Sequence, residues 1–388
     1  MKSKTKSLIL ASFLSLGLLL SIYTTSAATV TKTLYSWVKD AAGNISTSLS
    51  DTVDITLPDE PTNTYYISPS GNDTTGTGTT SNPWKSLYKA CNSVTTSGST
   101  IHVKAGTYTE TLSCNLAVGV SIEGEGQNNT IINSTYSFSV LPSGDFAKGS
   151  IALISSSENT PGNQTISDLT LDGGWTSTST NTTTATRGII IRRRGNVTLN
   201  RISVKNFWVA GIGFYGGYPF TQPTVRTDGN ILMNSTVRNN GNGYWSYGGS
   251  YEGGAGVEVY GQSNLLVHDN TISNIDRPDR NSDLMARFDF SVGVKIYNNE
   301  FWKTEMEGPN NLWNFGLETW NIQGGVEIYD NNFHGGYIPI DIGGPINTKG
   351  TYDYSVKIYR NNIVRATAVD ASEGGAVAIH LESTQEIS

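Results

Sequence analysis

The chain has 388 residues, enough for one large domain or two ordinary ones, and its formal net charge is -7. This mildly acidic balance argues against a nucleic-acid-binding protein, which needs a basic face. Ile, Val, Tyr and Trp are plentiful and regularly spaced, which argues against intrinsic disorder.

The N-terminus has the pattern of a secretory signal peptide. Three lysines precede an apolar run that ends in small residues near Ala27 and Ala28, and this run is short for a membrane-spanning helix. We therefore expect residues 1–28 to be cleaved. The mature protein is predicted to be secreted, periplasmic or extracellular, with no membrane association after cleavage.

The next segment, residues 29–63, is predicted to form a hairpin followed by a linker. The stretch "LYSWVKDAAGNISTSLSDTVDIT" is similar to the final hairpin of bacterial immunoglobulin-like modules, with "AAGN" as the turn. It is too short for a domain, so it is either a remnant or a strand pair that rests on the rest of the protein. "LPDEPTN" then has the composition of a linker.

The stretch from Tyr65 to Leu112 carries a family resemblance. It resembles the opening of secreted right-handed parallel β-helix proteins of the pectin lyase-like superfamily. The resemblance implies an all-β solenoid over residues 64–388, with "SLYKACNSV" as a short N-terminal capping helix and "TIHVKAGTY" as the first full strand. The superfamily holds lyases, hydrolases, epimerases, esterases and phage tailspikes, so the resemblance implies a fold more than an activity.

Two shorter features lie in this stretch. Cys91 and Cys114 either pair in an oxidising compartment or remain buried thiols. The "SGND" that contains Asp73 is predicted to be an ordinary turn, with a structural Ca²⁺ site as the alternative.

An eight-residue phrase recurs from about residue 160, as in "VKIYNNEF" and "VEIYDNNF". Its period near thirty residues, with β-branched alternation and no helical pattern, predicts a solenoid whose coils stack. The closing apolar residues of the copies are Leu171, Val204, Val237, Ile272, Phe301, Phe333 and Ile363. Four copies share an asparagine (Asn270, Asn299, Asn331 and Asn361), which predicts an internal structural ladder. The chain stops inside a further predicted strand, so the domain is either truncated or covered there by a partner.

A second series of strands predicts a column of acidic side chains on the outside of the solenoid. Side chains alternate across a strand, so the residue after each inward apolar residue should face solvent. The aligned inward residues are Ile189, Ile212, Val257, Phe288, Leu317, Ile340 and Ile379. The residues that follow them are Ile190, Gly213, Glu258, Asp289, Glu318, Asp341 and His380. The next outward column contains Arg192, Tyr215, Tyr260, Ser291, Trp320, Gly343 and Glu382.

Stacked carboxylates repel each other and are tolerated where they share a proton or bind a cation. The alternative is a solvated acidic stripe with little cost in water. We therefore predict a catalytic group of Glu318, Asp341, Asp289, Glu258 and His380. The predicted substrate-binding residues are Trp320, Tyr260, Tyr215, Arg192 and Arg287.

Three functions remain open from the sequence, all with a polysaccharide as partner. A glycoside hydrolase would use Glu318 with Asp341, or Asp289 with Asp341, as acid and base and would need no cofactor. A polysaccharide lyase would hold Ca²⁺ with Glu258, Asp289, Glu318 and Asp341, but its catalytic base is not evident. A non-catalytic carbohydrate-binding or adhesive protein would use the aromatic residues alone. The sequence favours the hydrolase and leaves the polysaccharide unidentified.

Overall fold

The protein is described here from a computed structural model. It describes residues 29–36, 39–47, 49–56, 63–135, 150–175, 187–217, 223–241, 244–247, 250–274, 284–303, 315–322, 324–335, 338–343, 355–364 and 379–381. The chain divides into two compact units, Met1–Thr62 and Asn63–Ser388. The predicted signal peptide and residues 57–62 of the predicted linker lie outside the described residues.

The first unit contains an antiparallel hairpin of β1 (Thr29–Ser36) and β2 (Leu49–Thr56). The predicted "AAGN" turn lies between these strands. Its geometry is held by Asp40, whose Oδ1 accepts hydrogen bonds from the N–H groups of Ala42 and Asn44, both at 2.9 Å. Gly43 has a φ of 93°, which glycine adopts without steric cost. The relation of this hairpin to immunoglobulin-like modules stays a prediction.

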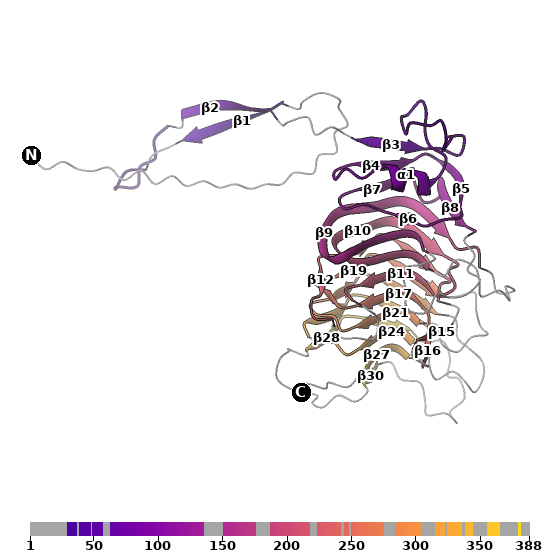
Figure 1. Cartoon of the computed structure of the whole chain (residues 1–388). Helices are drawn as coiled ribbons and strands as arrows, with labels where there is room; N and C mark the ends of the chain where they lie inside the picture. Colours follow the sequence, from indigo (N-terminus) through magenta and orange to yellow (C-terminus); the bar gives the residue numbers. More distant parts are fainter. Residues whose placement is uncertain are drawn as a thin grey trace, which may run out of the picture. The chain divides into compact units, whose positions relative to one another are not determined.

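The second unit is a coil of parallel strands, in which each coil contributes one strand to each of three stacks (Figure 1). We call these stacks sheet 1, sheet 2 and sheet 3. This arrangement confirms the predicted right-handed parallel β-helix. Two strands, β9 (Ser150–Asp172) and β10 (Arg187–Lys205), run continuously through all three sheets.

Sheet 1 contains β6 (Cys114–Asn115), the first parts of β9 and β10, β11 (Ala210–Tyr215), β17 (Ala255–Tyr260), β21 (Leu284–Asp289), β24 (Phe315–Trp320), β27 (Ile338–Gly343) and β30 (Ile379–Leu381). Sheet 2 contains β3 (Thr64–Ile67), β4 (Thr100–Val103), β7 (Ser121–Gly124), the middles of β9 and β10, β13 (Ile231–Met233), β19 (Leu266–His268), β22 (Lys295–Tyr297), β25 (Val326–Tyr329) and β28 (Val356–Tyr359). Sheet 3 contains β5 (Gly106–Glu110), β8 (Thr130–Ser134), the ends of β9 and β10, β14 (Thr236–Arg238), β20 (Thr271–Asn274), β23 (Glu300–Lys303), β26 (Asn332–His334) and β29 (Asn362–Val364).

Two short pairs stand beside the three sheets. β12 (Thr227–Asp228) pairs in parallel with β18 (Gln262–Ser263), and β15 (Tyr244–Tyr247) forms an antiparallel pair with β16 (Ser250–Gly253).

The predicted register of the repeats is confirmed in sheet 3. All seven closing apolar residues pair with their neighbours along the stack, from Leu171 to Ile363. The rings of Phe301 and Phe333 stack with their centroids 4.7 Å apart. These side chains fill the interior of the coil, so each coil buries its apolar face against the next.

The asparagine ladder lies at the corner between sheets 2 and 3 and confirms its predicted structural role. Asn299 Oδ1 accepts from the N–H of Asn270 at 3.0 Å, and its own N–H donates to Asn331 Oδ1 at 3.0 Å. The left-handed backbone lies one residue earlier than the asparagine pattern indicated, for example at Asn298 with a φ of 54°. The ladder amides therefore hold the corner, while the residue before each one makes the turn.

The capping helix is α1 (Leu87–Ser93), which begins after Ser86, whose hydroxyl accepts from the N–H of Lys89. Its buried residues join the core at the end of the coil. Cys91 forms a disulfide with Cys114, with the two Cα atoms 5.4 Å apart, so α1 is tied to β6. Within the described residues, no helix is long and apolar enough to span a membrane.

Candidate functional site: a buried carboxylate network on sheet 1

The acidic column exists on sheet 1, but its order differs from the prediction at one strand. In register, the column reads Gly213, Glu258, Arg287, Glu318, Asp341 and His380. Arg287 thus takes the place predicted for Asp289. Asp289 lies in the neighbouring column, in register with Tyr260 on one side and Trp320 on the other.

The difference has a simple physical origin. The sequence alignment placed Phe288 opposite Leu317 because both are large and apolar, whereas the structure pairs Leu317 with Ala286 and Phe288 with Thr319. Side chains of a strand repeat every two residues, so a shift of two keeps the same faces inward and outward. The prediction therefore had the correct face and the wrong position along the strand.

The solvent exposure predicted for these carboxylates is also wrong. Glu258, Asp289, Glu318 and Asp341 are only 1–6% exposed. They lie on the outer face of sheet 1, opposite the interior of the coil. On this same outer face, Ile190, Tyr215 and Tyr260 form an apolar cluster of their own. Charged groups buried to this extent must be compensated by charge or hydrogen bonds.

Arg287 provides part of that compensation. Its Nε and Nη2 atoms both lie 3.1 Å from Asp289 Oδ2, and its Nε lies 3.4 Å from Glu318 Oε2. One guanidinium therefore joins carboxylates from β21 and β24. A cation at this distance stabilises the ionised form of each acid.

Glu258 belongs to a second group of contacts on the same face. The Tyr215 hydroxyl donates a hydrogen bond to Glu258 Oε2, and Arg187 Nε lies 3.9 Å from the same oxygen. The phenol ring reaches Glu258 by lying over Gly213, where a Cβ atom would come within 2.6 Å of the ring. Burial, together with the Glu258 charge, raises the pKa of Tyr215 although Arg187 opposes it, so Tyr215 remains a protonated donor.

The predicted sugar platforms Tyr215 and Tyr260 are packed against each other. Their ring centroids are 5.6 Å apart, and both rings are buried with Ile190. Burial raises the pKa of Tyr260 above its ordinary value, with Arg287 opposing the rise and Asp289 adding to it. These tyrosines therefore line the carboxylate network and do not present a ring face to solvent.

For Arg192, His380 and Trp320, the structure gives the position along sheet 1. Arg192 is half-buried and in register with Tyr215. His380 is in register with Asp341, and Trp320 with Asp289 and Gly343, but the side chains of His380 and Trp320 lie outside the described part of the chain. The catalytic and binding roles of all these residues stay predictions.

Arg187 is the residue that sequence reasoning missed. Arg187 lies two residues before Ile189 and four before Ile191, and both of these side chains point into the core. The alternation of side chains along a strand therefore predicted that Arg187 faces inward, away from Glu258. Its pKa is raised: burial opposes the charged form, but Tyr215 and Glu258 outweigh that effect. Arg187 thus stays charged beside Glu258.

The four carboxylates do not fit the calcium site that a lyase would need. Arg287 separates Glu258 from Glu318 along the column and contacts Asp289 and Glu318 itself. Over the described ranges, no three His, Cys, Asp or Glu side chains converge as metal ligands. A Ca²⁺ ion, which prefers six or more oxygens, would compete here with a guanidinium already in place.

Comparison with known proteins supports the fold. No protein-family model matches the chain, and no curated protein matches its sequence. Among solved structures, it is similar to a rhamnogalacturonan lyase, with a TM-score of 0.50 and 14% identity over 83% of this chain and 86% of that one. A pectin methylesterase from Aspergillus niger gives a TM-score of 0.48 and 10% identity over 84% and 91%. Pectate lyase Pel9A gives 0.46 and 14% over 80% and 78%.

The likeness to the rhamnogalacturonan lyase concerns the fold alone. The second unit has the pectin lyase-like fold, a right-handed parallel β-helix. At 10–14% identity, the likenesses carry no particular activity to this chain.

Proposed function

We propose that the protein is an exported glycoside hydrolase that cleaves a polysaccharide with Glu318 and Asp341. The observation that carries this proposal is the pairing of Glu318 on β24 with Asp341 on β27, together with the contact of Arg287 to Glu318. Within the column, Glu318 lies between Arg287 and Asp341, and Asp341 lies between Glu318 and His380. Such unequal surroundings are what separate the roles of two catalytic acids.

The spacing supports a retaining mechanism. Paired strands lie about 4.8 Å apart, close to the ~5–5.5 Å that separates the carboxyl groups of retaining glycosidases. The alternative pair of Asp289 and Asp341 is not in one column, because Asp289 is in register with Trp320. The geometry therefore favours Glu318 with Asp341.

Each carboxyl group has a separate task in the proposed reaction. Asp341 donates its proton to the glycosidic oxygen while Glu318, kept ionised by Arg287, attacks the anomeric carbon and releases the leaving sugar. Asp341, now ionised, then removes a proton from water, which attacks the glycosyl ester and frees Glu318. Because both groups are buried, the surface over sheet 1 must open to admit a sugar chain.

Export is part of the proposal. Its supports are the signal-peptide pattern of residues 1–28 and the Cys91–Cys114 disulfide, since disulfides persist in oxidising compartments. No cofactor is assigned to the reaction.

A polysaccharide lyase is the second candidate, because Arg287 brings a basic side chain among the acids, although the same side chain stands in the way of a Ca²⁺ site. A lyase needs a base to remove the proton beside a uronate carboxylate, and Arg287 is a cation among the predicted site residues. However, its contacts with Asp289 and Glu318 stabilise the charged guanidinium, which opposes a role as base.

The test is a polysaccharide panel incubated with the protein, with and without a Ca²⁺ chelator. Reducing ends and the ultraviolet absorbance of unsaturated uronic ends are followed together. We expect new reducing ends without absorbance, unaffected by chelation, and a first product that keeps the anomeric configuration. Glu318→Gln and Asp341→Asn should each lower kcat by a factor of about 10² or more.

Glu327→Gln on sheet 2 is the matched control, because it makes the same change on a neighbouring face of the same coil. It should leave kcat unchanged. New reducing ends that appear together with the ultraviolet absorbance of unsaturated uronic ends would make the protein a lyase. Binding without either product would make it a carbohydrate-binding protein, and both results overturn the proposal.

A further inference from the structure

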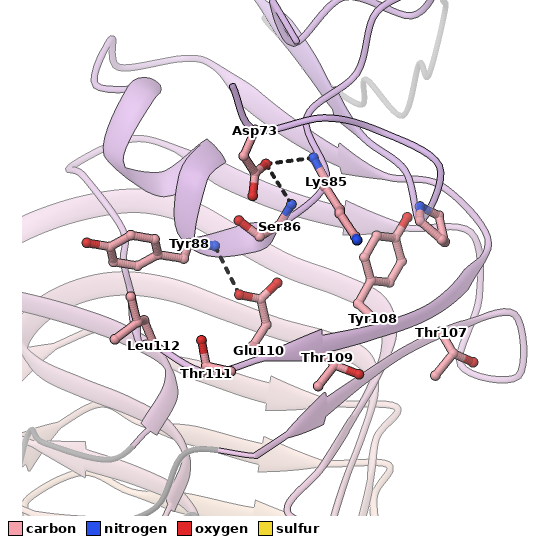
Figure 2. A pocket seen from close by; sticks show the side chains of 11 residues that line it. Asp73, Lys85, Ser86, Tyr88, Thr107, Tyr108, Thr109, Glu110, Thr111 and Leu112 are labelled. Atoms are coloured by element: carbon pink, nitrogen blue, oxygen red, sulfur yellow. Dashed lines mark hydrogen bonds between the residues drawn. The ribbon is translucent and has the colours of Figure 1, made fainter. Parts of the chain in front are cut away.

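A pocket at the N-terminal end of the β-helix lies apart from the sheet 1 column (Figure 2). Its volume is about 470 Å³, within the ~300–1,000 Å³ range of ligand pockets. Three segments line it: the turn that carries Pro69 and Asp73, the entry to α1 with Lys85, Ser86 and Tyr88, and residues 107–112 in and after β5. No residue of the column contributes to it.

Two carboxylates fix the frame of this pocket, as Figure 2 shows. Asp73 Oδ1 accepts from the N–H groups of Lys85 and Ser86 at 2.7 and 3.0 Å. Glu110, which is buried, accepts from the N–H group of Leu87 at 2.6 Å. It also accepts from the N–H group of Tyr88 at 3.3 Å, the bond drawn in Figure 2. The turn, the helix and the strand are thereby held together before any ligand arrives. Asp73 thereby ties its own turn to the two residues that precede α1, which is a structural role.

The wall of the pocket combines apolar surface with hydroxyl groups. Tyr88 and Leu112 are large side chains that remain 40% and 46% exposed, and Figure 2 shows them toward one end of the pocket. Thr107, Thr109 and Thr111 are exposed at alternate positions, while Tyr108 and Glu110 between them are buried. A sugar ring has an apolar face for an aromatic ring and hydroxyls for polar side chains, so it matches both parts of this wall.

The charges of the pocket indicate which kind of sugar fits. Asp73 and Lys85 bring one negative and one positive side chain to the same wall, and burial raises the pKa of Glu110, the second carboxyl group of the lining. Burial opposes ionisation of Asp73, but the Ser86 hydroxyl and the N–H groups of Ser86 and Lys85 lower its pKa overall. The Asp73 carboxylate would repel an anionic polymer, whereas the hydroxyl groups of a neutral sugar can hydrogen-bond both to this carboxylate and to the Lys85 ammonium group.

We propose that this pocket is a non-catalytic binding site for a neutral oligosaccharide segment, which holds a polysaccharide to the protein away from sheet 1. The inference rests on the proposed function only for the class of ligand, since its structural evidence is the pocket itself. It adds a second point of attachment, and a chain bound at one site raises the local concentration of sugar at the other.

The test is affinity electrophoresis in gels that contain xylan, β-1,4-galactan, mixed-linkage β-glucan or polygalacturonate. The protein carries Glu318→Gln, so that the probe is not degraded during the run. We expect retardation by at least one of the three neutral polymers. Tyr88→Ala should weaken that binding at least about fivefold, and Thr109→Val, which keeps the β-branched shape, by about two- to tenfold.

Tyr35→Ala is the matched control, because Tyr35 is 62% exposed and lies in the first unit. It should bind as the parent does. The Tyr88→Ala variant keeps the backbone N–H that donates a hydrogen bond to Glu110. Circular dichroism checks that the variant folds. Equal binding by Tyr88→Ala and Tyr35→Ala overturns the inference, as does retardation by polygalacturonate alone or by no polymer.

The two proposals fail separately. Tyr88-dependent binding by a protein that cleaves nothing would keep this pocket and remove the hydrolase. Cleavage without any effect of Tyr88→Ala on binding would do the reverse.

Discussion

Arg287→Met should reveal how much the carboxylate network depends on its central cation. The guanidinium lies 3.1 Å from Asp289 and 3.4 Å from Glu318, and its side chain is 14% exposed. At an effective dielectric constant of ~20, each contact is worth about 5 kcal/mol of Coulomb attraction before desolvation is subtracted. Removing one partner of a buried ion pair typically costs about 3–5 kcal/mol, because the remaining charges stay buried without compensation.

We therefore expect Arg287→Met to lower the free energy of unfolding by about 3–5 kcal/mol, measured by urea denaturation at neutral pH. Met keeps most of the aliphatic stem, so the loss reports the charge. The control is Arg201→Met, which removes an Arg with shorter contacts to Asp168, both 2.7 Å, but with its side chain 55% exposed. Surface pairs contribute about 1 kcal/mol or less. Equal losses in the two variants would refute the argument that burial determines the cost.

Three further changes test other parts of the fold. Cys91→Ser should lower the free energy of unfolding by about 3 kcal/mol, because it opens a loop with a sequence separation of 23; reduction of the wild type should give the same loss in calorimetry. Asn299→Ala removes an amide that donates to Val267 and Tyr297 carbonyls, both at 2.9 Å, and should cost about 3 kcal/mol or more in urea denaturation. Burial raises the pKa of Glu110 above 4.5 despite its backbone hydrogen bonds, so the folded state binds this proton more readily than the unfolded state. That contribution is present below the unfolded pKa and is lost as pH rises through the folded one. The Tm of the wild type minus the Tm of Glu110→Gln should therefore become larger on acidification, whatever the other carboxyl groups do to both proteins.

The sequence predicted the β-helix well because its evidence was periodic. Each closing apolar residue, such as Phe301 or Phe333, recurs at nearly the same interval, and stacking of like on like is the only way for one coil to bury its apolar face. The asparagine ladder was predictable for the same reason. The side-chain bond from one ladder amide to the next, as from Asn299 to Asn331, requires an amide at the same corner of both coils.

The site was less predictable because its register rests on a single strand. Alternation fixes which face a residue occupies, but it cannot distinguish two positions on the same face, so Arg287 takes the place predicted for Asp289, and Asp289 the place predicted for Ser291. Apolar size was the only guide, and it failed where the small Ala286 takes the core position opposite Leu317. Burial was also beyond reach, because a strand pattern gives the direction of a side chain and not what covers it.

The corrected register sharpens the electrostatic argument for the site. The sequence placed four acids in one column, so every neighbour in it would repel the next. With Arg287 in the column, Glu258 and Glu318 each lie next to a cation, and the repulsion between them is relieved. Glu318 and Asp341 are then the two acids that remain in direct register. Two acids in direct register repel each other unless they share a proton or another group compensates them, so the proposed acid–base role of this pair stays a prediction that Glu318→Gln and Asp341→Asn test.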